Sequence, residues 1–93
     1  METLEMAARL YRAEDGEYCA SGQAELWIQP SHEDLPGRWG GTLRLSDVAP
    51  TLREYDFAFR LELEDGREAQ TFAELRLDEG VAILDGNGPP PGA

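Results

Sequence analysis

The chain has 93 residues, of which 41% are hydrophobic, and its 19 acidic and eight basic residues give a formal net charge of -11. This length fits one domain with a small core, and the composition is that of a globular chain rather than a disordered one. All eight basic residues are Arg and they do not cluster, which argues against direct binding to nucleic acid or to an anionic membrane surface.

The acidic charge has two interpretations. It would attract a basic protein partner and speed the encounter. The plainer interpretation is that an acidic, Lys-free chain reflects a GC-rich bacterial genome or a salt-rich cytoplasm. The single cysteine, Cys19, excludes an intramolecular disulfide, and no signal peptide or membrane span is visible, so we expect a cytoplasmic protein.

Alternating apolar and polar residues predict six strands, in chain order at residues 4–11, 18–29, 38–45, 55–63, 68–77 and 81–84. Gly22 interrupts the second strand and predicts a bulge or bend. Residues 30–37 form a loop bounded by prolines, and the Thr51-x-x-Glu54 pattern is a helix-start signal in a segment too short for more than a turn or two. We expect one β domain over residues 1–85 and a Gly- and Pro-rich tail over residues 86–93.

The strongest local signal is the Glu64-Asp65-Gly66 turn between the fourth and fifth strands. A two-residue turn would mix charged and apolar residues on both faces. A three-residue loop with a left-handed Gly66 instead pairs Phe59 with Thr71, Phe57 with Ala73 and Tyr55 with Leu75, which makes one face almost wholly apolar. This register turns Phe72 away from the core, and we expect Phe72 to be more exposed than Leu75.

Together these signals predict an all-β fold, a small antiparallel barrel or strongly curved sheet of about six strands, with helix limited to short turns. An open sheet completed by a second subunit is the main alternative.

The residues that could carry chemistry do not form a convincing site. Cys19 and His32 are the only thiol–imidazole pair, and Cys19 has the character of a buried strand residue. One His and one Cys cannot make a structural zinc site, and Asp85-x-Asn87-Gly88 lacks the remaining ligands of a calcium loop. The carboxylates around the hairpin turn fit a solvated strand end. We therefore expect no cofactor, no metal and no enzymatic activity.

Trp27 and Phe72 are large aromatic residues at positions that alternate with the apolar ones, so we expect their side chains to point away from the core. Both are therefore candidates for partner contact. We expect a non-catalytic protein-interaction or self-association module, whose partner is another protein or a second copy of this chain. Two alternatives remain open. One is an acidic immunity or inhibitor protein that neutralises a basic enzyme, and the other is a carrier of a small apolar ligand near Trp39 and Tyr55.

Overall fold

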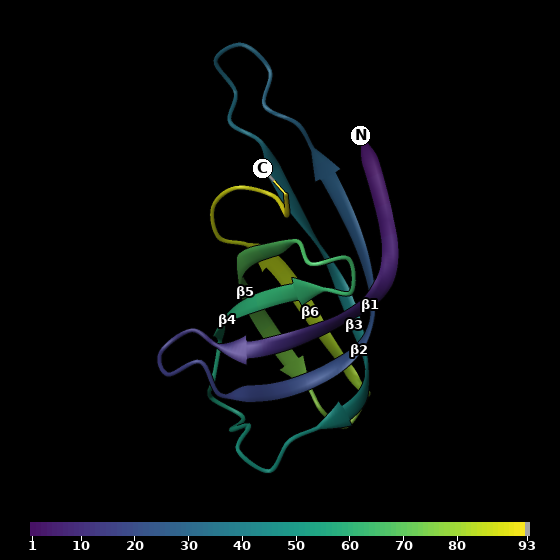
Figure 1. Cartoon of the computed structure of the whole chain (residues 1–93), viewed down its shortest axis with the longest axis vertical. Coiled ribbons are helices and arrows are strands. Elements are labelled where there is room, and N and C mark those ends of the chain that lie inside the picture. Colours follow the sequence, from purple (N-terminus) through teal and green to yellow (C-terminus); the bar gives the residue numbers. More distant parts are fainter. Residues whose placement is uncertain (93) are drawn as a thin grey trace.

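Six antiparallel strands form a closed barrel in the computed structural model, which describes residues 1–92 (Figure 1). The strand order is β1-β2-β3-β6-β5-β4, and β4 pairs back with β1 to close the barrel. The strands are β1 (Glu2–Arg12), β2 (Tyr18–Gln29), β3 (Arg38–Val48), β4 (Ala58–Leu63), β5 (Glu68–Arg76) and β6 (Val81–Gly86). The predicted all-β fold is confirmed, and its closed form is the one found.

Two three-stranded meanders build the barrel, β1-β2-β3 and β4-β5-β6, and residues 49–57 connect them. The meanders are joined along two seams, where β3 pairs with β6 and β1 pairs with β4. Both seams pair strands that are distant in the sequence, so closure depends on non-local contacts rather than on turns.

The hairpin between β4 and β5 has the predicted register. Phe59 pairs with Thr71 and Leu61 pairs with Ala69, as the three-residue loop requires. Gly66 has a φ of 93° and its amide donates to the Leu63 carbonyl at 2.9 Å. Glycine adopts this backbone angle without the steric cost of a Cβ atom.

The expected start of this strand was wrong. The strand β4 begins at Ala58, and both Tyr55 (72% exposed) and Phe57 (63% exposed) lie outside the core. A single backbone bond, from the Ala73 amide to the Phe57 carbonyl at 2.8 Å, continues the ladder. The side chain that enters the barrel end here belongs to Asp56, which is buried beside Arg12.

Side chains fill the barrel interior. The largest fully buried residues come from five of the strands and include Leu10, Trp39, Leu43, Phe59 and Leu61. Large residues oppose small ones across the ladders, as where Leu61 pairs with Ala69, which lets a narrow barrel pack without voids. The predicted bulge is present as a register shift between Ser21 and Gly22.

Short turns take the place of the expected helical turns. The Thr51-x-x-Glu54 pattern does not cap a helix, because the Thr51 hydroxyl donates instead to the Tyr18 carbonyl at 3.0 Å. Backbone bonds from Leu52 to Ala49 and from Asp56 to Arg53 close two successive turns there. No helix in residues 1–92 is long and apolar enough to cross a membrane.

The molecule is elongated, with extents of 43 × 24 × 23 Å. Figure 1 shows why: the N-terminal half of β1 and the β2–β3 hairpin extend beyond the barrel body. The C-terminal segment folds back over the same end of the barrel. Its Asn87 amide donates to the Gln70 carbonyl at 2.9 Å, and Pro91 is buried.

Candidate functional site

The structure places both predicted contact residues on the outer surface of the barrel. Trp27 is 37% exposed and Phe72 is 38% exposed, whereas Leu75 is half-buried against the core. The expectation that Phe72 is more exposed than Leu75 is confirmed. Each of these aromatic residues leaves a large apolar surface in contact with water.

Trp27 and Phe72 belong to one row of outward positions. Trp27 in β2 pairs with Gly40 in β3, Gly40 pairs with Asp85 in β6, and Asp85 pairs with Phe72 in β5. We call these four residues the aromatic row. The row depends on the pairing of β3 with β6, two strands that are distant in the sequence and whose adjacency the local sequence does not reveal.

Gly40 lets the indole of Trp27 lie flat on the sheet. A Cβ atom at Gly40 would come within 3.0 Å of Trp27 Cζ2 and 3.2 Å of its Cε2. The ring therefore covers the glycine backbone and is held toward Asp85. A larger residue at position 40 would lift the indole away from the barrel.

Phe57 extends the aromatic row, and sequence reasoning missed it by placing its side chain in the core. Its ring stacks on Phe72, with ring centroids 5.8 Å apart and an interplanar angle of 21°. Aromatic pairs of this kind add to the stabilisation from burial alone. No sequence signal separates this position from a core position, because Phe57 continues the apolar alternation of β4.

The face around the aromatic row is close to neutral. Two further rows of outward residues lie beside this row on the same strands, and they contain two arginines and two glutamates. Together with Asp85 the twelve positions carry a net charge of −1. The residues of the two further rows are Glu25, Thr42, Ile83, Glu74, Gln23, Arg44, Val81 and Arg76. The arginines lie beside these glutamates, with Arg44 at 3.9 Å from Glu25 and Arg76 at 2.6 Å from Glu74. Most of the net charge of -11 therefore lies elsewhere on the molecule.

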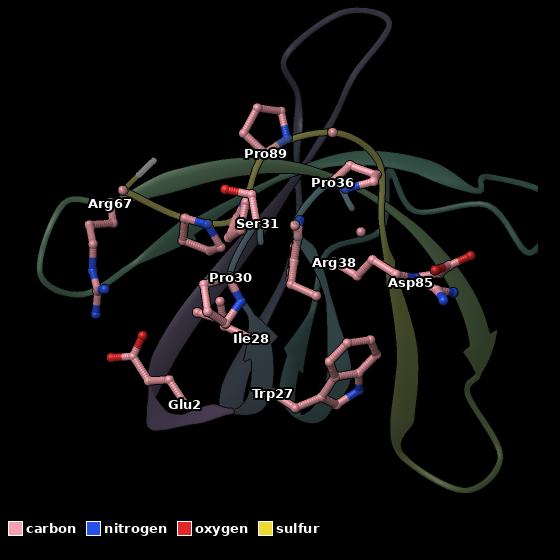
Figure 2. A pocket seen from close by; sticks show the side chains of 17 residues that line it. Glu2, Trp27, Ile28, Pro30, Ser31, Pro36, Arg38, Arg67, Asp85 and Pro89 are labelled. Carbon is pink, nitrogen blue, oxygen red and sulfur yellow. The ribbon is translucent and has the colours of Figure 1, made fainter. Parts of the chain in front are cut away.

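An open cleft of about 940 Å³ lies at the end of the barrel, between the β2–β3 hairpin and the C-terminal segment (Figure 2). Trp27, Arg38 and Asp85 line one side of it, so the cleft adjoins the aromatic row. Trp39 closes its floor: this indole is 2% exposed and its Nε1 atom has no hydrogen-bond partner among the described residues. The Trp39 ring packs against Gly86, where a Cβ would come within 2.4 Å of Nε1.

A buried ion pair closes the opposite end of the barrel. Arg12 lies 3.1 Å from Asp56, and their side chains are 8% and 6% exposed. Burial opposes ionisation of Asp56, but hydrogen bonds from the Arg53 amide and from Arg12 outweigh it and hold the pKa of this carboxyl below its usual value. The hydrogen bond to Asp56 likewise raises the pKa of Arg12. This pair has a structural role, since both groups are enclosed by the fold.

The structure does not bring the thiol and the imidazole together. Cys19 is the second residue of β2 and is fully buried, and burial raises the pKa of its thiol. His32 lies in the exposed loop beyond the last residue of β2, so the length of that strand separates the two. The Cys19 thiol donates instead to the Glu17 carbonyl at 3.4 Å.

Three acidic residues at and beside the hairpin turn contact arginines. Asp65 lies 2.8 Å from Arg67, and Glu62 and Glu68 both contact Arg60. Within residues 1–92 no group of three or more His, Cys, Asp or Glu side chains is placed to hold a metal ion. Tyr55 and Trp39 do not share a cavity, because the first is exposed and the second is in the core.

Comparisons with protein-family models, with curated proteins and with solved structures found no match to this chain. The functional argument consequently depends on the surface chemistry of the barrel itself.

Proposed function

We propose that this chain is a non-catalytic protein-interaction module that binds another protein chain through the aromatic row. The observation that carries the proposal is the alignment of Trp27, Asp85 and Phe72 in one row across β2, β3, β6 and β5, with Phe57 stacked on Phe72. Partly exposed Trp and Phe side chains on a rigid sheet are typical of the centre of protein interfaces, where such residues supply much of the binding energy.

The charge distribution supports the same face. The twelve outward positions around the aromatic row carry a net charge of only −1. A partner docked there would avoid most of the repulsion that a net charge of -11 imposes on other approaches.

Site-specific photo-cross-linking tests the proposal. A photoreactive phenylalanine analogue replaces Trp27, Phe72 or Tyr55 in turn, and cells that produce the protein are irradiated. Tyr55 is the matched control, because it is aromatic and 72% exposed but lies off the aromatic row. We expect one cross-linked partner, a second copy included, from positions 27 and 72 and none from position 55. Equal labelling at all three positions would overturn the proposal.

The acidic inhibitor remains a second candidate, supported by the net charge of -11. Such a protein would bind a basic enzyme with an association rate that falls steeply as salt is added. Binding through the aromatic row depends on apolar burial and would change little with salt. The salt dependence of association with the cross-linked partner therefore separates the two functions.

A further inference from the structure

The N-terminal half of β1 has a free edge. The strand pairs with β2 from Glu2 onward, but its pairing with β4 starts only at Ala8. The last bond of that second ladder is from the Glu64 amide to the Ala7 carbonyl at 3.0 Å. Among the described residues, positions 2–6 therefore have a neighbouring strand on one side alone, as Figure 1 shows for the segment near the N-terminus.

The direction of the free backbone groups follows from the ladder. In an antiparallel strand the amide and carbonyl of one residue point to the same side, and the side alternates along the chain. Because the Ala7 carbonyl points to the β4 side, Thr3 and Glu5 point there as well. Two amides and two carbonyls are thus presented to an incoming strand, while Leu4 and Met6 bond to β2.

The side chains beside this edge define what would fit. Leu4 and Met6 are half-buried and pack against the core from the inner face. On the outer face Glu5 lies directly opposite Glu25, an unfavourable pairing of like charges. Glu25 has Arg44 at 3.9 Å, whereas Glu5 has no basic group within 4.0 Å among residues 1–92.

A cleft adjoins the first residue of this edge. Glu2 lines the barrel-end cleft of about 940 Å³, and Arg67 and Gly92 line the same cleft. Figure 2 shows the side chains of Glu2 and Arg67 at the same side of the cleft, across from Asp85. The Arg67 guanidinium lies 2.8 Å from Asp65, which offsets its repulsion of a basic ligand.

We propose that the edge of β1 at residues 2–6 binds an extended segment of a partner protein in which basic and apolar residues alternate. The segment pairs with the amides and carbonyls of Thr3 and Glu5. Its apolar side chains contact Leu4 and Met6, and its basic side chains lie beside Glu5. Main-chain bonds supply affinity in this mode of recognition, and the alternating side chains supply specificity.

A second copy of this chain fits the edge poorly. Pairing two β1 edges would bring Glu2 and Glu5 of both copies into one short ladder, and each copy has a net charge of -11. A basic segment reverses the sign of this interaction. The site adjoins the aromatic row, because Thr3 pairs with Trp27, but it binds through the free backbone groups of β1 rather than through the aromatic rings. It therefore goes beyond the proposed function and is tested without it.

The experiment uses the full chain and a synthetic peptide of alternating valine and lysine, about seven residues long to match an ordinary strand. Amide hydrogen exchange is followed by NMR with and without the peptide. In the free protein we expect fast exchange at Thr3 and Glu5 and slower exchange at Leu4 and Met6. The peptide is expected to slow exchange at Thr3 and Glu5, and a peptide with glutamate in place of lysine is expected not to.

Two variants separate the backbone from the charge. Glu5→Pro removes an amide that faces the open edge and leaves the β1–β2 ladder intact, whereas Glu5→Gln keeps that amide. We expect Glu5→Pro to weaken peptide binding about tenfold relative to Glu5→Gln, and Glu5→Gln to lower the salt dependence of binding. The exchange data on the wild-type chain do not depend on how either variant folds.

Slow exchange at Thr3 and Glu5 in the free protein would overturn the proposal, because the edge would then be covered. So would equal binding of the lysine and glutamate peptides, equal binding by the two variants, or a concentration-dependent dimer that protects these amides. The proposed function is unaffected by any of these results, since its cross-linking test also requires labelling at Phe72, and β5 does not pair with β1.

Discussion

Removing the negative charge of Asp56 tests the account of the buried ion pair at the barrel end. In Asp56→Asn the shape of the side chain is kept and its charge is lost. The wild-type carboxylate accepts hydrogen bonds from Arg12 Nε at 3.2 Å and from the Arg53 amide at 3.0 Å, and it lies 3.2 Å from the Arg53 guanidinium. The variant leaves the enclosed Arg12 with Asp15, whose side chain is 44% exposed, as its remaining carboxylate partner.

The expected loss follows from this geometry. Removing one member of a buried pair costs about 3–5 kcal/mol of stability. Because Asp15 still contacts Arg12, we expect the free energy of unfolding to fall by about 3 kcal/mol. A domain of this size has a total stability of roughly 5–14 kcal/mol. The change is therefore a substantial fraction of the whole and lies well within the range of a denaturation experiment.

Urea unfolding at neutral pH, followed by tryptophan fluorescence, to which buried Trp39 contributes, measures this loss. The matched control is Glu14→Gln, because that carboxylate lies 4.0 Å from Arg53 and is 81% exposed. We expect its midpoint to match that of the wild type. A loss of less than about 1 kcal/mol for Asp56→Asn would refute the argument that Arg12 depends on this charge.

The pH dependence of the stability difference between wild type and Asp56→Asn is a further test of the ion pair. The pKa of Asp56 is lower in the folded chain than in the unfolded one, so its contribution is complete above the ordinary aspartate pKa. The contribution is lost as the pH falls from that value through the lowered pKa. The stability gap between wild type and Asp56→Asn is therefore expected to stay constant in mildly acidic buffer and to close in strong acid. A gap that widens in acid would contradict the assignment.

Two substitutions and one labelling experiment test other parts of the fold. Gly66→Ala is expected to cost about 1 kcal/mol in urea unfolding, because its φ of 93° is unfavourable for alanine although a Cβ would meet nothing within 4 Å. Gly41→Ala is expected to cost about 3 kcal/mol or more, since its Cβ would lie 2.0 Å from the Glu25 carbonyl oxygen; a cost no larger than that of Gly66→Ala would contradict this. The Cys19 thiol is expected to react with a thiol reagent only at the rate of unfolding, and rapid labelling of native protein would show that it is not buried.

The parts of the fold that sequence reasoning predicted are those set by local chemistry. The Glu64-Asp65-Gly66 loop determines the register of β4 and β5, because a one-residue slip would turn every side chain to the other face. The same register predicted the outward position of Phe72. Gly22 predicted the bulge in β2 because a glycine inside a strand pattern often marks one. In the structure a Cβ there would lie 1.8 Å from the Arg44 carbonyl oxygen.

The parts that were not predicted depend on contacts distant in the sequence. Phe57 and Asp56 exchange the positions that alternation would give them, because Asp56 is drawn inward by Arg12, a residue 44 positions away. The aromatic row exists only once β3 lies between β2 and β6, and sequence periodicity does not reveal strand order. The free edge of β1 likewise depends on where β4 starts to pair.

Quantitative co-purification tests the central claim, that the chain binds another protein through its aromatic row. Wild type, the Trp27→Ala/Phe72→Ala double variant and Tyr55→Ala are each recovered from cells that produce the protein, and the associated chains are measured by mass spectrometry. The account predicts a partner, or a second copy, that accompanies wild type and Tyr55→Ala and is lost from the double variant. Equal recovery with all three forms, from double-variant protein shown to be folded, would contradict it.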